Sequence, residues 1–151
     1  MVKNIYFLLV DDDSDDTFLF EDVLLGIEPS AHFNSAVNGL DALNKIRVGS
    51  TLPDVIFLDL NMPGMDGKEC LAQLKKDNDL KNIPVIIYTT SSLSKDIELT
   101  MQMGAAGFIT KPDNMKELKS ILSSIVAGMK HNNLQKALQT LSFSSTTFIV
   151  C

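Results

Sequence analysis

Short apolar runs of strand length alternate with helical patterns along most of this chain, and this alternation constrains the fold more than any other feature. Three of the runs are almost entirely apolar and rich in β-branched residues: Ile5–Val10, Val55–Leu58 and Val85–Tyr88. Strands that are apolar on both faces belong to parallel sheets that helices cover on both sides. The pattern therefore predicts a parallel sheet buried between two layers of helices.

Two weaker strand candidates, His32–Val37 and Phe108–Thr110, bring the number of runs to five. Each run is followed by apolar residues that recur at helical spacing. The stripe after the first run comprises Phe18, Leu19, Val23 and Leu24. Five strand–helix units that end near Gly128 predict a doubly wound α/β fold with right-handed crossovers.

We expect residues 1–128 to form one domain and residues 129–151 to form a C-terminal extension. One more helical stripe is formed by Leu134, Ala137, Leu138 and Leu141. This stripe predicts a helix that packs against the domain or projects from it. The polar segment Ser142–Thr147 and the apolar segment Phe148–Cys151 are expected to form a frayed tail, with a role in self-association as the alternative.

Negative charge is concentrated near the N-terminus. The formal net charge is −6, from 13 basic and 19 acidic residues, and five of the acids are Asp11, Asp12, Asp13, Asp15 and Asp16. An acidic chain argues against binding nucleic acid or an anionic membrane through bulk charge. No apolar run reaches the roughly 20 residues of a membrane span, and the N-terminal apolar stretch is too short for a signal sequence. We therefore expect a cytoplasmic protein.

Polar side chains follow four of the five strand runs, where parallel strands bring their carboxyl ends to one edge and ligands bind. These residues are Asp11 and Asp12, then Asp59 and Asn61, then Thr89 and Thr90, then Lys111. Several carboxylates close together stay ionised only if a cation lies among them. Oxygen ligands without clustered cysteine or histidine select a hard ion, Mg²⁺ or its substitute Mn²⁺.

A lysine and a hydroxyl opposite these carboxylates would complete a site for a phosphoryl group. Lys111 can neutralise phosphoryl oxygens, and Thr89 can donate a hydrogen bond to one of them. A carboxylate can itself accept the group and become an aspartyl phosphate. Asp59 is the best candidate because it follows the middle strand of the set.

Four segments resemble the receiver domain of two-component response regulators, of the standalone, chemotaxis-regulator type. They are LLVDDD at 8–13, LDLNMPGMDG at 58–67, IPVIIYTT at 83–90 and GAAGFITKP at 104–112. The resemblance covers residues 4–128 and implies a flavodoxin-like receiver fold with five parallel strands. The 23 residues after Gly128 are too few for an effector domain, so we expect a single-domain regulator.

The resemblance implies a role for each residue of the predicted site. Asp59 would be the phosphoacceptor. Asp12 would bind Mg²⁺ directly and Asp11 directly or through water, with Asp59 and the backbone carbonyl of Asn61 completing the coordination. Lys111 would pair with Asp59 and then contact the phosphoryl group.

The resemblance also implies a switch. Thr89 would be the hydroxyl that moves toward the phosphoryl group, and Phe108 either the aromatic residue that turns inward with it or a plain core residue. Backbone amides around Asn61 and Thr90 would face the phosphate.

The remaining aspartates of the cluster have a simpler explanation. Ser14 is the expected N-cap of the first helix, and Asp15 and Asp16 would be ordinary first-turn acids that favour the helix dipole. Asp13 suits either the metal site or the start of the helix.

The implied function is signalling. The protein would accept a phosphoryl group from a sensor histidine kinase or a histidine phosphotransfer protein and catalyse only its own phosphorylation and dephosphorylation. Its output would be contact with an unidentified protein target through Ser94–Gly128, with homodimerisation through that face or the tail as a further expectation.

Two alternatives stay open at the level of sequence. One is a haloacid-dehalogenase-type phosphatase with its nucleophile among Asp11–Asp13, although the chain lacks a clear late acidic pair and room for a cap domain. The other is a degenerate receiver that acts as a scaffold, against which the complete set of acceptor, metal aspartates, hydroxyl and lysine argues.

Overall fold

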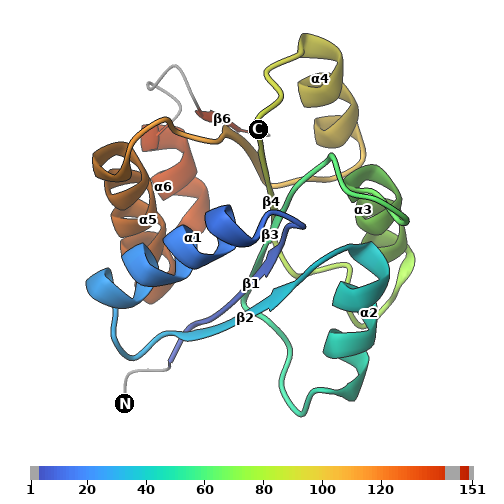
Figure 1. Cartoon of the computed structure of the whole chain (residues 1–151), viewed down its shortest axis with the longest axis horizontal. Coiled ribbons are helices and arrows are strands. Elements are labelled where there is room, and N and C mark those ends of the chain that lie inside the picture. The colour runs from blue at the N-terminus through green and yellow to red at the C-terminus, as the bar shows by residue number, and fades with distance from the viewer. Residues whose placement is uncertain (1–3, 142–146, 150–151) are drawn as a thin grey trace.

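A parallel sheet lies between two layers of helices in the computed structural model, which describes residues 4–141 and the backbone of residues 147–149 (Figure 1). The parallel strands are β1 Tyr6–Val10, β2 His32–Ala36, β3 Val55–Leu58, β4 Val85–Thr89 and β5 Gly107–Thr110. Their order in the sheet is β2-β1-β3-β4-β5. This architecture confirms the predicted doubly wound fold with five parallel strands.

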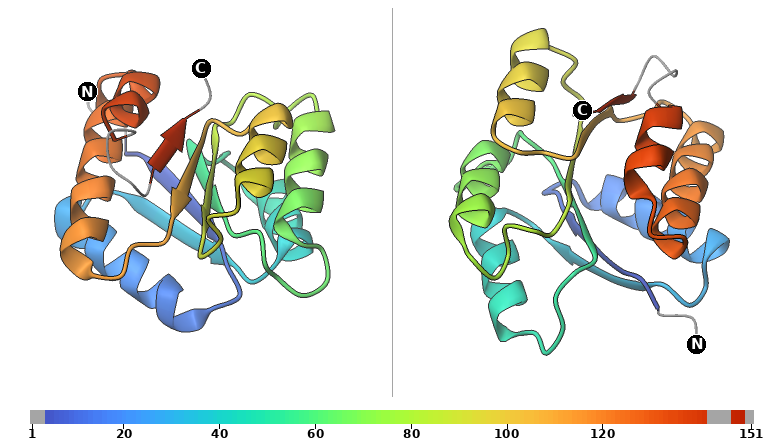
Figure 2. Two further views of the ribbon diagram at one scale, coloured as in Figure 1. Left: turned by 90° about the horizontal axis from the view of Figure 1, so that it is seen from above. Right: turned by 180° about the vertical axis from the view of Figure 1, so that it is seen from behind.

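Helices cover both faces of the sheet. They are α1 Ser14–Ile27, α2 Gly39–Val48, α3 Gly67–Lys76, α4 Ser94–Gln102, α5 Met115–Lys130 and α6 Leu134–Leu141. Figures 1 and 2 show α1, α5 and α6 on one side of the sheet and α2, α3 and α4 on the other. None of these described helices is both long enough and apolar enough to cross a bilayer.

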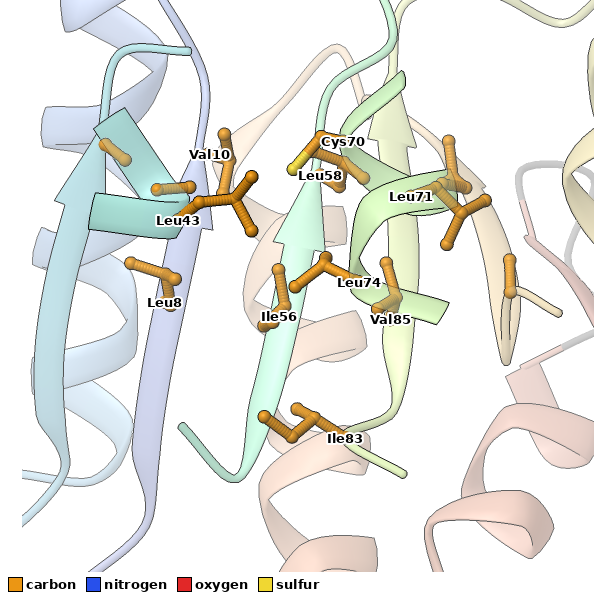
Figure 3. Close-up of a cluster of buried hydrophobic side chains, with 14 of the residues drawn as sticks. Leu8, Val10, Leu43, Ile56, Leu58, Cys70, Leu71, Leu74, Ile83 and Val85 are labelled. Atoms are coloured by element: carbon orange, nitrogen blue, oxygen red, sulfur yellow. The ribbon is translucent and has the colours of Figure 1, made fainter. Parts of the chain in front are cut away.

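Side chains along each strand alternate between the two layers, because successive residues of a strand point to opposite faces. In β1, Leu8 and Val10 pack toward α2 and α3, as Figure 3 shows, whereas Phe7 and Leu9 belong to the core under α1 and α5. All four are fully buried. Both faces of the strand must therefore be apolar, and this is why the strands read as uninterrupted apolar runs in the sequence.

The apolar stripe of α1 differs from the predicted one. Phe20, Val23 and Leu24 are its buried residues, whereas Phe18 is 71% exposed. At 3.6 residues per turn, Phe18 lies about 200° around the helix from Phe20 and cannot share its face. Including Phe18 in the core stripe was therefore wrong.

The C-terminal helix is part of the core. Leu138 is fully buried and Leu141 nearly so, in the cluster that also contains residues of α1 and α5. The prediction of a helix over Leu134–Leu141 is confirmed, and the helix packs against α5 rather than projecting from it. Gly128 makes the approach possible, because a Cβ atom there would lie 2.6 Å from Cβ of Ala137.

A sixth strand follows, which the sequence interpretation did not include. The backbone of β6, Thr147–Ile149, pairs antiparallel with β5, and Gly107 lies opposite Ile149 (Figure 2). The expected frayed tail is therefore wrong for these three residues, since the edge of β5 offers unpaired N–H and C=O groups that an extended segment can satisfy. The rest of that predicted tail, residues 142–146 and 150–151, lies outside the described residues.

The packing of α6 leads to a test with two glycines. Gly128→Ala should lower the free energy of unfolding by about 1–3 kcal/mol, because the added methyl group forces α5 and α6 apart. Gly26→Ala in α1 is the matched control, since apart from its chain neighbours and the nearby backbone of its own helix no described atom lies within 4 Å of a Cβ atom there. That variant should be neutral or gain up to about 1 kcal/mol from its higher helix propensity. Urea unfolding followed by circular dichroism measures both; equal changes in the two variants would contradict the close α5–α6 contact.

Candidate functional site

The sheet continues for one residue beyond three of its strands and so fixes the start of each loop at the carboxyl edge. The backbone N–H of Asp11 donates to the carbonyl of Ala36 at 2.9 Å, and that of Asp59 to the carbonyl of Val10 at 2.9 Å. The N–H of Lys111 donates to the carbonyl of Thr89 at 2.7 Å. The two acids and the lysine are thus held by the sheet itself.

Three carboxylates meet at this edge. One oxygen from each of Asp11, Asp12 and Asp59 lies within 4.8 Å of the other two. Asp11 and Asp59 are buried, at 2% and 5% exposure, while Asp12 is exposed. Carboxylates this close repel one another in a poorly solvated pocket, and a hard divalent cation is the partner that such oxygen ligands fit. The structure therefore brings the predicted metal aspartates together.

The ammonium group of Lys111 lies among carboxylates from three elements. Its Nζ is 2.7 Å from Oδ2 of Asp11, 2.7 Å from Oδ2 of Asp16 and 3.6 Å from Oδ2 of Asp59. The expected pairing with Asp59 is present, but it is the longest of the three contacts. The close contact with Asp16 was not expected.

Burial and charge act in opposite directions on these groups. Burial raises the pKa of Asp11 to about 6, although the neighbouring Lys111 opposes the rise. Burial alone would lower the pKa of Lys111, but its hydrogen bonds to Asp11 and Asp16 raise it above the ordinary value. Lys111 is therefore cationic at any physiological pH. The charge of Asp11 depends on its neighbours, and a divalent cation beside it would favour the ionised form.

The buried hydroxyl of Thr89 makes no hydrogen bond within the described part of the fold. The residue is fully buried at the end of β4, and no described residue offers its Oγ1 a hydrogen-bond partner. Leaving a buried polar group unpaired costs about 1–3 kcal/mol. A hydroxyl that is unpaired at the edge where the carboxylates and Lys111 meet is suited to donate to a bound ligand.

The loop after β3 is shaped around the acceptor candidate. The backbone N–H of Asn61 donates to Oδ1 of Asp59 at 3.3 Å, so this amide does face the carboxylate. The start of α3 lies directly against the same loop, because a Cβ atom on Gly67 would lie 2.1 Å from the carbonyl oxygen of Asp59. Only glycine permits this approach. Thr90 is exposed directly after β4.

Phe108 lies in the core rather than at the edge. It is fully buried among residues between the sheet and α2–α4, and in the β4–β5 register it lies opposite Ile87. Thr89 and Thr110 form a pair two residues further along the same strands. Since side chains two apart share a face, the ring of Phe108 and the hydroxyl of Thr89 are on the same side of the sheet.

The aspartates near the N-terminus have different roles from those predicted from the sequence. Asp13, not Ser14, is the N-cap of α1, and its carboxylate accepts the N–H groups of Asp15 and Asp16 at 2.9 and 3.2 Å. Asp15 is an exposed first-turn acid, as expected. Asp16 is not, because its carboxylate binds Lys111.

The sequence does indicate which face of α1 Asp16 lies on. It lies four residues, about one helical turn, before Phe20, which is buried against the sheet. An acid at that position must face the carboxyl edge. The signal was lost because the predicted stripe of α1 began at Phe18 instead of Phe20.

The chain belongs to the response regulator receiver domain family, whose model matches residues 7–123. It is 33% identical over 123 residues to the response regulator Rcp1 of Synechocystis sp., which is 78% of this chain and 84% of Rcp1. The predicted family is thereby confirmed: the chain contains a receiver domain of two-component response regulators, a signalling family whose members receive phosphate from histidine kinases.

Solved structures of response regulators are similar to this chain over most of its length. The crystal structure of the phosphorylated cyanobacterial phytochrome response regulator RcpA is similar with a TM-score of 0.78 and 30% identity, over 84% of this chain and 94% of RcpA. The Mn²⁺-bound form of Rcp1 is similar with a TM-score of 0.74 and 31% identity, over 83% of this chain and 94% of the other.

The unpaired hydroxyl predicts an unusual stability effect. Thr89→Val should leave the free energy of unfolding unchanged or raise it by about 1 kcal/mol, because it removes a buried polar group that has no partner. Thr100→Val is the control, since that hydroxyl is equally buried but donates to the carbonyl of Asp96 at 2.8 Å. It should lose about 1 kcal/mol. Urea unfolding without Mg²⁺ or phosphodonor compares them, and a similar loss in both would show that Thr89 is paired in the fold.

Proposed function

We propose that Asp59 accepts a phosphoryl group from a histidine kinase or a histidine phosphotransfer protein, and that the modification switches a protein-interaction surface. The observation that carries the proposal is the meeting of the Asp11, Asp12 and Asp59 carboxylates within 4.8 Å, with the Lys111 ammonium beside them. The phosphorylated RcpA and the Mn²⁺-bound Rcp1 support it as relatives in the same family.

The transfer needs little covalent chemistry from the protein. A carboxylate oxygen of Asp59 attacks phosphorus, forming an O–P bond as the P–N bond to the donor histidine breaks and the imidazole leaves with that electron pair. Lys111 balances charge on the phosphoryl oxygens. The N–H of Asn61, which contacts Asp59, and the free hydroxyl of Thr89 can donate to them.

Asp11, Asp12, Asp59 and the backbone carbonyl of Asn61 would hold Mg²⁺ or Mn²⁺. Bound there, the cation would offset the charge that the carboxylates and the incoming phosphoryl group bring together. In this proposal the protein catalyses its own phosphorylation and dephosphorylation and no other turnover, and it works in the cytoplasm with its kinase.

The surface that responds would comprise α4, β5 and α5, within Ser94–Gly128. Thr89 and Phe108 share the face of the sheet that α4 covers, which links the acceptor to this surface through packed side chains. α6 packs against α5 and β6 pairs with β5, so α4 is the element left most open to a partner (Figure 1). The downstream target would be a protein, and homodimerisation through this face stays a prediction.

The test is phosphoryl uptake from acetyl phosphate with Mg²⁺, followed by intact-protein mass. The wild-type chain should gain one phosphoryl group and Asp59→Asn none, because the acceptor carboxylate is gone. Asp15→Asn, which alters an exposed acid of the same cluster, should behave as the wild type. Omitting Mg²⁺ should suppress uptake.

Borohydride reduction of the acyl phosphate and peptide mapping then identify the modified residue. A label on Asp11 instead of Asp59 would support the phosphatase alternative and overturn the proposal. No uptake by the wild-type chain would favour the scaffold.

A further inference from the structure

The first-turn acid Asp16 is joined to the site by the position of Lys111. We propose that Asp16 is a positioning residue: it holds the Lys111 ammonium against α1 and so keeps the acceptor and metal carboxylates available to the divalent cation. The inference rests on the proposed function, because it concerns the cation of the same site.

The contacts of Lys111 are unequal. A lysine ammonium has three N–H donors. Asp16 accepts a hydrogen bond at 2.7 Å and Asp11 forms an ion pair at the same distance, whereas Asp59 lies at 3.6 Å and the ring of Tyr88 lies 5.7 Å from Nζ. The Lys111 side chain is only 9% exposed, so water is a poor substitute for any of these partners. Asp16 therefore accepts one of the three hydrogen bonds that the ammonium can donate, and it lies outside the cluster of Asp11, Asp12 and Asp59.

Removing the Asp16 carboxylate would leave one N–H group of the Lys111 ammonium without its acceptor. The ammonium would turn toward Asp59 and Asp11, the carboxylates still within its reach, and would become their counterion. An ammonium and a divalent cation that require the same oxygens compete. The Asp16 carboxylate also acts after the cation binds. It remains paired with Lys111 when Asp11 binds the cation, and its negative charge offsets the repulsion between the ammonium and the cation.

Asp15 offers a matched comparison with Asp16. The two residues lie in the same turn of α1, and both backbone N–H groups are accepted by Asp13, so neither side chain is needed for the cap. Asp15 is exposed, while the Asp16 side chain is 35% exposed and bound to Lys111. Asp15→Asn and Asp16→Asn remove the same charge from nearly the same place and differ in the contact with Lys111.

The experiment is Mg²⁺ binding to the unphosphorylated chain, measured by isothermal titration calorimetry. Asp16→Asn should weaken the affinity about tenfold, whereas Asp15→Asn should change it less than about twofold, as expected for a screened surface charge. Asp16→Glu should restore most of the affinity. In a Lys111→Met background, the effect of Asp16→Asn should shrink to that of Asp15→Asn, because the coupling runs through the ammonium.

The outcomes separate this inference from the function on which it rests. Equal affinities of Asp16→Asn and Asp15→Asn overturn the role of Asp16 and leave the acceptor proposal intact. A tenfold loss that persists in the Lys111→Met background also overturns it, because Asp16 would then act on the cation directly. If the wild-type chain binds no Mg²⁺, the metal site and the role of Asp16 both fail.

Discussion

Charge balance at the carboxyl edge of the sheet is the constraint on which the rest of the site depends. Four carboxylates, those of Asp11, Asp12, Asp16 and Asp59, converge there with one ammonium, that of Lys111. The lysine alone leaves an excess of negative charge in a pocket where Asp11 and Asp59 have little access to water. Burial is the main reason that the pKa of Asp11 is raised, and the negative charge of Asp59 adds a smaller contribution. A divalent cation would offset the excess of negative charge, and it would be needed all the more once a phosphoryl group adds further negative charge to the same edge.

The scaffold keeps these charges close at the expense of its own stability. Two apolar layers, one on each face of the sheet, fix the strands, and backbone hydrogen bonds beyond the strand ends fix Asp11, Asp59 and Lys111. Gly67 lets α3 begin against the acceptor loop. The unpaired hydroxyl of Thr89 and the crowded carboxylates both work against folding. In the proposed function, this cost would be offset when the cation and the phosphoryl group bind.

Most of the fold and of the site could be predicted because both follow from local patterns. Strand β3 has the bounds expected from its apolar run. The parallel topology then brings Asp11, Asp59, Thr89 and Lys111 to one edge.

The N-cap of α1 and the role of Asp16 could not be predicted in this way. Asp13 and Ser14 are both good caps, and which of them caps α1 depends on where the chain leaves β1. The contact of Asp16 with Lys111 joins residues 95 positions apart.

By itself, then, the sequence determined the alternation of strands and helices, the edge at which the functional groups collect and the family to which the chain belongs. These depend on the period of apolar residues and on short motifs, which act within a few positions. Only the tertiary structure decided that Asp16 shares Lys111 with Asp59, that the hydroxyl of Thr89 is unpaired, and that α6 and β6 lie against α5 and β5. Each of these depends on distances between segments far apart in the chain, which are set when the two cores pack and not by any local pattern.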